Sequence, residues 1–266
     1  MAEPAALLEL DDCTIRFGGL TAVSGLTTRI GEQEMVALIG PNGAGKTTVF
    51  NLVTGVYRPT GGAIRLAGQS LVGLRPWQIT ARGIARTFQN IRLFSGLSVF
   101  DNVRVGFNRH LRQGPWQALM RLPAFRAEEQ RIAARTLELL EIFDLARMRD
   151  EPARSLPYGS QRRLEIVRAL ATGPRLLLLD EPAAGMNPTE KAELTRLIRF
   201  VKERFRIAVL LVEHDMHVVM EICERIVVLD YGVKIAEGSP AAVRADPRVI
   251  EAYLGAEAAG DGAAHA

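Results

Sequence analysis

The chain carries the stretch Gly40-Pro41-Asn42-Gly43-Ala44-Gly45-Lys46-Thr47-Thr48, which matches the pattern G-x-x-x-x-G-K-[ST] and directly follows the aliphatic run at residues 35–39. Glycines in this pattern let backbone N–H groups turn toward phosphate oxygens, and the N-terminus of the next helix adds positive potential. Lys46 supplies charge for the β- and γ-phosphates, and Thr47 supplies a hydroxyl for Mg²⁺. The stretch therefore predicts a phosphate-binding loop between a strand and a helix.

Apolar runs predict the strands of a parallel sheet. They lie at residues 35–39, 176–179, 207–212 and 226–229. Unbroken aliphatic runs are typical of strands that are buried on both faces. Between two of them, Leu194, Leu197 and Ile198 follow the i, i+3, i+4 spacing of a helix, and Asn187 and Pro188 suit its first positions. Helices thus alternate with buried strands, as in α/β proteins.

The rest of the chain predicts two additions to this core. Residues 7–17 and 62–68 predict an antiparallel sheet beside the parallel one. Residues from about 95 to 170 are mostly helical in pattern and predict a helical subdomain, inserted between Gln89 and the strand at 176. We therefore expect an α/β fold: a P-loop NTPase core with a mixed sheet, an antiparallel β subdomain and an inserted helical subdomain. The domain covers residues 7–254, and residues 255–266 are expected to be a disordered tail.

Polar residues follow the predicted strands at the edge where ligands bind in open α/β sheets. Asp180 is expected to hold Mg²⁺, directly or through water, and Glu181 to orient or deprotonate the water that attacks the γ-phosphate. His214 follows another strand and is expected to contact the γ-phosphate, with His217 as a competing candidate. Gln89 is expected to reach Mg²⁺ or the attacking water. Together these residues predict phosphoryl-transfer chemistry.

The composition excludes several classes of protein. Of the 266 residues 48% are apolar and 24% charged, so the chain suits a sizeable core and is not a collagen, a coiled coil or a disordered chain. Cys13 and Cys223 are the two cysteines, which argues against a disulfide framework and favours a reducing compartment. Residues 1–10 do not resemble a signal peptide. No apolar run approaches the roughly 20 residues that a spanning helix needs.

The basic residues are mostly balanced by acidic ones. The net charge is +3, and 29 of the 33 basic residues are Arg. Because the two signs alternate along most of the chain, we expect a solvated surface of mixed charge. One stretch differs, since seven Arg stand against three acidic residues between Asp101 and Arg135. That stretch is a candidate docking surface.

The order of the motifs resembles that of the ATP-binding cassette (ABC) ATPases. The resemblance covers about residues 7–254 and rests on Phe17, the phosphate loop, Gln89, residues 156–161, the Asp180-Glu181 pair, residues 183–187 and His214. It implies ATP and Mg²⁺ as cofactors and a pair of subunits that sandwich two nucleotides. In that arrangement Gly159, Ser160 and Gln161 of one subunit face the phosphate loop of the other. Phe17 would stack on the adenine, and a place in the core is its alternative.

Two positions depart from the common family pattern. Where the family signature reads Leu-Ser-Gly-Gly-Gln, this chain has Leu156-Pro157-Tyr158-Gly159-Ser160. Ser160 or backbone N–H groups would then meet the γ-phosphate, at the N-terminus of a predicted helix. The loop after the carboxylate pair ends in Asn187 where Asp is common, so this position carries no negative charge.

These departures resemble the ATP-binding subunits of branched-chain amino-acid importers. The resemblance extends to residues 87–94, 158–159, 161–166, 185–188 and 236–240. It implies a motor subunit that couples ATP binding and hydrolysis to the import of branched-chain or related hydrophobic amino acids. The expected partners are a second ATP-binding subunit in a heterodimer (a homodimer is the alternative), membrane-spanning permease subunits and, indirectly, a periplasmic or surface substrate-binding protein. The expected location is the cytoplasmic face of the inner membrane, as a peripheral protein.

Two other functions fit parts of the sequence. ATPase subunits of lipid or lipopolysaccharide exporters look similar, although residues 185–188 favour the importer. A soluble cassette ATPase that acts on nucleic acid would suit the basic charge. Relatives of that kind carry two cassettes or long coiled-coil insertions, whereas this sequence shows one phosphate loop and no sustained heptads. We therefore expect no nucleic-acid partner.

Overall fold

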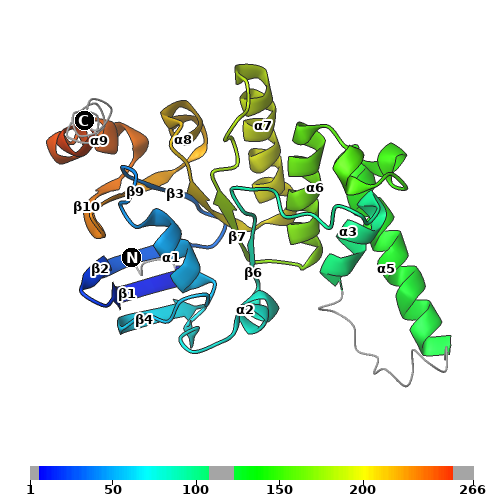
Figure 1. Cartoon of the computed structure of the whole chain (residues 1–266), viewed down its shortest axis with the longest axis horizontal. Helices are drawn as coiled ribbons and strands as arrows, with labels where there is room; N and C mark the ends of the chain where they lie inside the picture. The colour runs from blue at the N-terminus through cyan, green and yellow to red at the C-terminus, as the bar shows by residue number, and fades with distance from the viewer. Residues whose placement is uncertain (1–5, 108–122, 254–266) are drawn as a thin grey trace. The chain divides into compact units, whose positions relative to one another are not determined.

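The computed structural model of the chain describes residues 6–107 and 123–253 (Figure 1). It divides into two compact units. The first combines the described residues up to Ile84 with those from Arg175 onward, and the second lies between Ala85 and Pro174. The predicted tail at 255–266 lies outside the described residues, as do residues 108–122 of the Arg-rich stretch. The domain boundaries drawn from the sequence stay a prediction.

A mostly parallel sheet forms the centre of the first unit. Its strands are β3 (Met35–Ile39), β7 (Leu176–Asp180), β8 (Ala208–Val212), β9 (Arg225–Asp230) and β10 (Val233–Gly238), and the order is β10-β9-β3-β8-β7-β6. The chain leaves the unit along β6 (Ile84–Arg86). β3 is parallel to β8 and β9, β7 is parallel to β8, and β10 is antiparallel to β9. Every residue of β3, β7 and β8 is buried, which confirms the strands predicted from the aliphatic runs.

An antiparallel sheet completes the first unit. Its strands are β1 (Ala6–Phe17), β2 (Leu20–Gly31), β4 (Gly61–Leu66) and β5 (Gln69–Ser70), in the order β2-β1-β4-β5. The sheet and the strands β1 and β4 confirm the prediction, but β2 was not predicted. Its buried residues are Val23, Leu26 and Ile30, because irregularities in the register with β1 break the period of two. The buried residues of β2 therefore follow the i, i+3, i+7 spacing that is typical of a helix.

The helices described in the first unit are α1 (Lys46–Val53), α2 (Pro76–Arg82), α7 (Pro188–Phe205), α8 (Met216–Ile222) and α9 (Pro240–Arg244). In the part of the chain that the structure describes, side chains cap α7, α8 and α9, whereas α1 begins without a side-chain cap. At α7 the N–H of Glu190 donates to Asn187 Oδ1 (3.0 Å), and the N–H of Asn187 donates to Glu190 Oε2 (2.9 Å). This capping box confirms the predicted start of the helix. Among the described residues, none of the helices has the length and apolar character of a membrane span.

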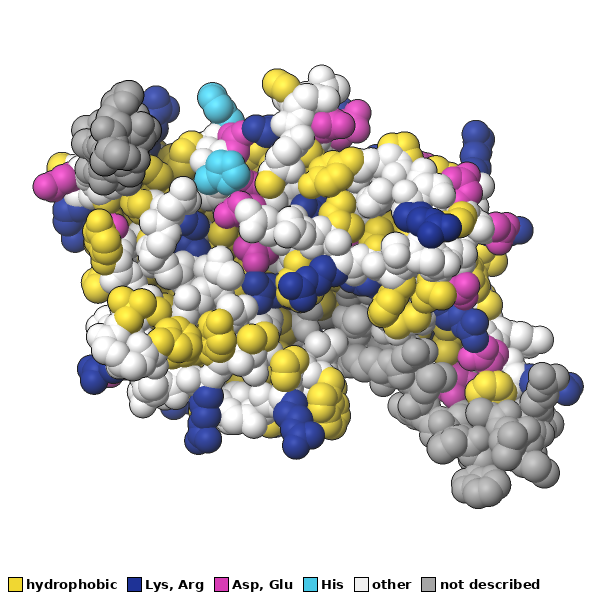
Figure 2. All heavy atoms as spheres, in the orientation of Figure 1, with side chains coloured by type: hydrophobic (Ala, Val, Ile, Leu, Met, Phe, Trp, Pro, Cys, Tyr) yellow, Lys and Arg dark blue, Asp and Glu magenta, His cyan; other side chains and the backbone are white. Residues whose placement is uncertain are grey.

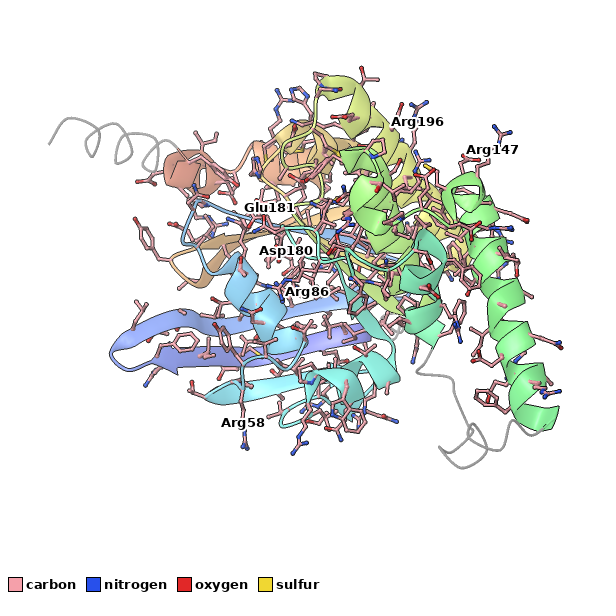
Figure 3. All side chains as sticks on the ribbon, turned by 45° about the vertical axis from the view of Figure 1, so that its right-hand side comes forward. Arg58, Arg86, Arg147, Asp180, Glu181 and Arg196 are labelled. Atoms are coloured by element: carbon pink, nitrogen blue, oxygen red, sulfur yellow. The ribbon has the colours of Figure 1, made fainter. Side chains whose placement is uncertain are left out.

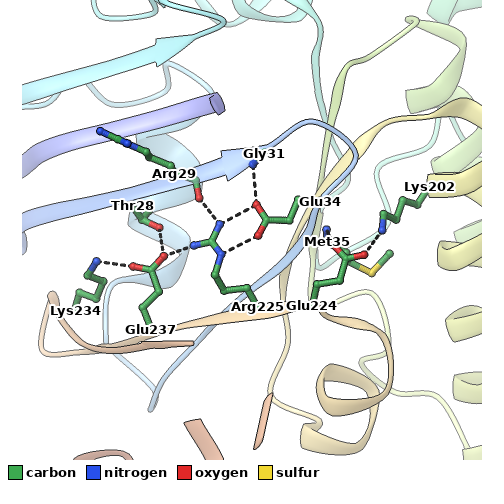
Figure 4. Close-up of polar contacts among 10 residues, drawn as sticks. All are labelled: Thr28, Arg29, Gly31, Glu34, Met35, Lys202, Glu224, Arg225, Lys234 and Glu237. Carbon is green, nitrogen blue, oxygen red and sulfur yellow. Dashed lines mark hydrogen bonds and ion pairs between the residues drawn. The ribbon is translucent and has the colours of Figure 1, made fainter. Parts of the chain in front are cut away.

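Arg225 joins several elements of the first unit through charged contacts (Figure 4). It lies at the start of β9 and donates to both carboxylate oxygens of Glu34, over 2.8 Å and 2.9 Å. It also pairs with Glu237 of β10 and donates to the backbone carbonyl of Arg29 in β2. Burial raises the pKa of Glu34, but the bonds from Arg225 and from the N–H of Gly31 outweigh it and hold this pKa below its usual value. The network therefore ties β2 to β9 and β10.

The described residues of the second unit include the helices α3 (Val99–Gly106), α5 (Pro123–Ile142) and α6 (Tyr158–Ala171). α3 packs against α5 and α6, and α5 packs against α6. Ser98 caps α3, because its Oγ accepts a hydrogen bond from the N–H of Asp101 (3.0 Å). Asn102 is buried, and its side-chain amide bonds both the N–H and the C=O of Phe94. All three helices lie within the region that the sequence predicts as helical.

A buried ion pair holds the Gln89 loop against α6. Arg162 and Glu165 are each 1% exposed, and Arg162 Nη1 donates to Glu165 Oε2 (2.9 Å). The guanidinium also donates to the carbonyls of Phe88 (2.7 Å) and Gln89 (2.8 Å), and Glu165 Oε1 accepts from the N–H of Arg92 (3.1 Å). Two charges thus satisfy the backbone of one loop, which is the condition under which buried charges are tolerated.

We expect Arg162→Met to lower the free energy of unfolding by about 3–5 kcal/mol, because it leaves the Glu165 carboxylate buried without its partner. Arg163→Met is the matched control, since Arg163 is half-buried and donates to the Phe143 carbonyl over 3.3 Å. Urea unfolding followed by circular dichroism measures both variants. Equal stability of the two variants would contradict the prediction.

Candidate functional site

A hollow of about 540 Å³ lies at the phosphate loop of the first unit. It is lined by the loop residues from Asn42 to Thr48 and, from other elements, by Phe17, Leu20, Thr21, Ala22, Glu181 and Tyr231. Gly40 and Pro41 do not line it. The predicted loop follows β3 and precedes α1, as the sequence pattern indicates.

Two glycines of the loop are required by space as well as by backbone conformation. Gly40 has φ +150°, and a Cβ there would lie 2.0 Å from the carbonyl oxygen of Leu229. Gly45 has φ +100°, caps α1, and would place a Cβ 2.7 Å from the carbonyl oxygen of Ala22. A side chain at either position would push the loop away from β2 or β9. The loop is therefore fixed by close backbone packing.

Lys46 bends back over its own loop. Its ammonium donates to the carbonyls of Gly40 (2.7 Å) and Pro41 (2.9 Å), and the residue is 8% exposed. Burial lowers the pKa of Lys46, and the nearby charges of Glu181 and Asp180 partly offset this effect. Lys46 is also the first residue of α1. The first turn of this helix contains no acidic residue, and among the described residues no side chain caps its backbone N–H groups. The positive end of this helix and the ammonium therefore favour an anion at the hollow.

The predicted carboxylates, Asp180 and Glu181, lie together at the end of β7 (Figure 3). Asp180 ends β7 and is 5% exposed. Glu181 has φ +44°, and its N–H donates to the carbonyl of Val212 at the end of β8 (2.8 Å). His214 Nδ1 lies 3.7 Å from Glu181 Oε2. The structure therefore brings Glu181 and His214 together at one edge of the sheet.

His217, the competing candidate, lies in the first turn of α8, and its backbone N–H donates to Asp215 Oδ1 (2.9 Å). No ion pair between its side chain and a described carboxylate accompanies this contact, whereas His214 adjoins Glu181. Figure 2 shows histidine side chains next to acidic ones on the face that it draws. The geometry favours His214, and its contact with a γ-phosphate stays a prediction.

The aromatic side chains of Phe17 and Tyr231 line the hollow. Phe17 ends β1, is 44% exposed, and makes an edge-to-face contact with Tyr57 at a centroid distance of 5.1 Å. Its exposure excludes the alternative of a core aromatic. Tyr231 also lines the hollow and was not predicted. It occupies the turn between β9 and β10, where the N–H of the next residue, Gly232, donates to the carbonyl of Ala44 in the phosphate loop (3.0 Å).

The remaining predicted residues belong to the second unit, whereas the hollow is formed by the first unit alone. Gln89 is exposed, and its backbone carbonyl accepts from Arg162. Gly159, Ser160 and Gln161 lie in the first turn of α6, and Gln161 Nε2 donates to the carbonyl of Leu156 (2.8 Å). The structure describes these residues within their own unit. Their roles at a nucleotide stay predictions.

Sequence reasoning missed Glu213. This residue follows β8 directly and is 1% exposed. Its Oε1 accepts from the N–H of Ala183 (2.7 Å), and its Oε2 accepts from the N–H groups of His214 (3.0 Å) and Asp215 (3.3 Å). The available signal was an acidic residue directly after a buried aliphatic strand, which is the same pattern that drew attention to Glu181.

Comparisons with known proteins establish the family. The model of the ABC transporter family matches residues 23–184, and a model described as branched-chain amino acid ATP-binding cassette transporter matches residues 233–259. The chain belongs to the ABC transporter family. It is a nucleotide-binding ATPase of that family, and both the family and the fold predicted from the sequence are confirmed.

The chain is similar to named members over almost its full length. It is 47% identical to the high-affinity branched-chain amino acid transport ATP-binding protein BraF of Pseudomonas aeruginosa, covering 94% of this chain and 98% of that one. Identity to LivG of Escherichia coli, which has the same description, is 46%, with coverages of 96% and 99%. The lipopolysaccharide export system ATP-binding protein LptB of Acidithiobacillus ferridurans is 36% identical, with coverages of 88% and 90%.

Solved structures share the architecture. An ATP-binding cassette of an ABC transporter in its ADP conformation superimposes with a TM-score of 0.81 and 28% identity, covering 94% of this chain and 99% of that one. A dimeric ATP-binding cassette in a post-hydrolysis state, bound to ADP and Pi, gives a TM-score of 0.72 and 25% identity, with coverages of 88% and 98%.

We expect Lys46→Ala to weaken ATP binding by about 1.5–3 kcal/mol, or roughly 10- to 100-fold, because it removes a charged donor at the hollow. Lys234→Ala is the control, since Lys234 lies in β10 and donates to the Thr27 carbonyl (2.6 Å). Titration calorimetry with ATP measures both variants. Wild-type affinity in Lys46→Ala would contradict the assignment of the hollow.

Proposed function

We propose that this ATPase is the motor subunit of an importer for branched-chain or related hydrophobic amino acids. The observation that carries the proposal is the match of residues 233–259 to the branched-chain amino acid model, because the general ABC model is shared with exporters. The 46–47% identity to LivG and BraF, against 36% to LptB, supports the same choice over lipopolysaccharide export. The ATPase would couple nucleotide binding and hydrolysis to transport.

Asp180 and Thr47 are the residues that would hold Mg²⁺, with Gln89 of the second unit as a third candidate. Among the described residues no cluster of three or more His, Cys, Asp or Glu side chains has the geometry of a metal site. This fits Mg²⁺, which takes one or two carboxylates and completes its shell with water and substrate phosphates. When bound, the ion would neutralise charge on the phosphates.

The other residues at the hollow would position the reaction. Lys46 and the N-terminus of α1 would bind the β- and γ-phosphates, and Phe17 would stack on the adenine. Glu181 would orient the attacking water and accept its proton, and His214, beside it, would contact the γ-phosphate. Phosphoryl transfer depends mainly on positioning and charge, which these residues would supply once a second subunit covers the nucleotide.

A second ATP-binding subunit would complete the site from outside through Gly159, Ser160 and Gln161. The dimeric relative that holds ADP and Pi supports this arrangement. We infer a heterodimer, with a homodimer as the alternative, that works with membrane-spanning permease subunits and a periplasmic or surface substrate-binding protein. The chain would then lie peripherally at the cytoplasmic face of the inner membrane. The described residues of the Arg-rich stretch would face anionic lipid headgroups there.

We expect Glu181→Gln to lower kcat for ATP hydrolysis by about 10²–10⁴-fold, because the amide cannot accept the proton of the attacking water. Binding of ATP should persist, since Lys46 is unchanged. Glu193→Gln, on the exposed face of α7, is the matched control. Phosphate release measures turnover and calorimetry measures binding. Undiminished turnover in Glu181→Gln would remove this residue from its proposed role.

Loss of this subunit from its native cells should reduce the uptake of radiolabelled leucine, isoleucine and valine, and the wild-type chain, but not Lys46→Ala, should restore it. Purification of the tagged chain should also recover permease subunits, which mass spectrometry identifies. Normal amino-acid uptake together with lipopolysaccharide retained in the inner membrane would instead support the exporter.

A further inference from the structure

Glu213 bonds two functional loops at once. Ala183, two residues after Glu181, donates its N–H to one carboxylate oxygen of Glu213 (2.7 Å). The backbone N–H groups of His214 (3.0 Å) and Asp215 (3.3 Å) donate to the other oxygen. With 1% of the residue exposed, no bulk water competes for these bonds.

We propose that Glu213 is a positioning residue for ATP hydrolysis, whose buried carboxylate holds the loop after Glu181 and the loop that carries His214 in one arrangement. The inference rests on the roles proposed above for Glu181 and His214. Glu213 would act by keeping His214 beside Glu181, without contact with the nucleotide.

The position of the His214 imidazole depends on the joint between the two loops, by which we mean the hydrogen bonds that Glu213 accepts from Ala183 on one side and from His214 and Asp215 on the other. His214 is 63% exposed at its side chain, so packing alone does not fix it. Its Nδ1 lies 3.7 Å from Glu181 Oε2 and 3.8 Å from Glu213 Oε2, between the two carboxylates. A shift of the His214 backbone would therefore move the ring away from Glu181. A displacement of about 1 Å in such a site is enough to lower turnover strongly.

A second contact crosses between the same two segments. Lys191 of α7 donates to Asp215 Oδ2 (2.6 Å), and Asp215 caps α8 through the N–H groups of His217 and Val218. α7 begins directly after the loop that contains Ala183. The hydrogen bond from Lys191 lowers the pKa of Asp215, so this pair stays charged at neutral pH. Lys191 therefore reinforces the joint that Glu213 makes.

The chemistry of the joint requires a carboxylate. Both oxygens of Glu213 accept hydrogen bonds from backbone N–H groups. The amide of a glutamine has one oxygen and one NH₂ group, so in either orientation it would place a donor against a donor. Glu213→Gln therefore breaks one side of the joint while keeping the size of the side chain.

The decisive experiment measures ATP hydrolysis and ATP binding by the purified full chain in Glu213→Gln. We expect kcat to fall by about 10- to 100-fold, as for other residues that orient a reacting group through hydrogen bonds, while the affinity for ATP stays at the wild-type value. Hydrogen exchange at the peptide that contains Ala183 should become faster, because its N–H loses an acceptor. Wild-type kcat, or wild-type exchange, would overturn the inference.

A double-mutant cycle with His214→Ala separates positioning from general damage. If Glu213 acts through His214, adding Glu213→Gln to His214→Ala lowers kcat little further. If Glu213→Gln lowers kcat by the same factor in both backgrounds, the inference is wrong. A wild-type kcat in His214→Ala alone would instead reject the role proposed for His214, so the two failures are distinguishable.

Glu224→Gln is the matched control. Glu224 also holds a backbone N–H, that of Met35 (3.0 Å), and pairs with Lys202 on the surface of the same unit (Figure 4). The kcat of Glu224→Gln should equal that of the wild type.

If Glu213→Gln does not fold, as judged by thermal unfolding, Lys191→Gln takes its place, because Lys191 is partly exposed and reinforces the same contact between the two loops. The Lys191→Gln variant should also lower kcat, and this effect should disappear in the His214→Ala background.

Discussion

The site depends on the register of three parallel strands. Val212, the last residue of β8, pairs with Leu38 of β3 on one side and with Asp180 of β7 on the other. The three strands therefore end at the same level, and the residues that follow them, the phosphate loop, Glu181 and Glu213, emerge at one edge of the sheet. A slip of one residue would turn the side chains of a strand to the opposite face and shift the residues that follow it, so the register of these strands sets the site.

Charge at this edge is balanced within the protein. Burial alone would favour the neutral form of Lys46, but Asp180 and Glu181 lie close enough to stabilise its charge. The carboxylate of Glu213 accepts its hydrogen bonds from backbone N–H groups. These backbone hydrogen bonds matter at a phosphate site, because a lysine or arginine that pairs with a structural carboxylate is not available to bind the nucleotide. Lys46 and the start of α1 lie at the hollow, where their positive charge favours an anion.

Much of this arrangement follows from the sequence, and the exceptions have physical causes. The strands β3, β7 and β8 are evident because burial on both faces demands unbroken aliphatic runs, and Asn187 marks the start of α7 through its own side chain. β2 escapes prediction because its register with β1 is irregular, so its buried residues do not alternate. Glu213 and Arg162 escape because each of them bonds backbone groups of a segment that is distant in sequence: Ala183 for Glu213, and Phe88 and Gln89 for Arg162. Arg162 and Glu165, three residues apart, resemble an ordinary pair on a helix surface, yet each is 1% exposed.

Both units use the same means to hold a functional loop. Arg162 bonds the carbonyls of the Gln89 loop, and Glu213 bonds the N–H groups of the His214 loop. Neither Gln89 nor His214 lies in a strand, so hydrogen bonds to buried charges help to fix the position of each loop. A side-chain contact with the backbone also explains why Asn187 can take the place of the aspartate that is common in the family without disturbing the structure. Its side-chain oxygen accepts the N–H of Glu190, a bond that asparagine and aspartate make about equally well as helix caps. The departure from the family pattern therefore changes the charge presented at this loop while leaving the start of α7 intact.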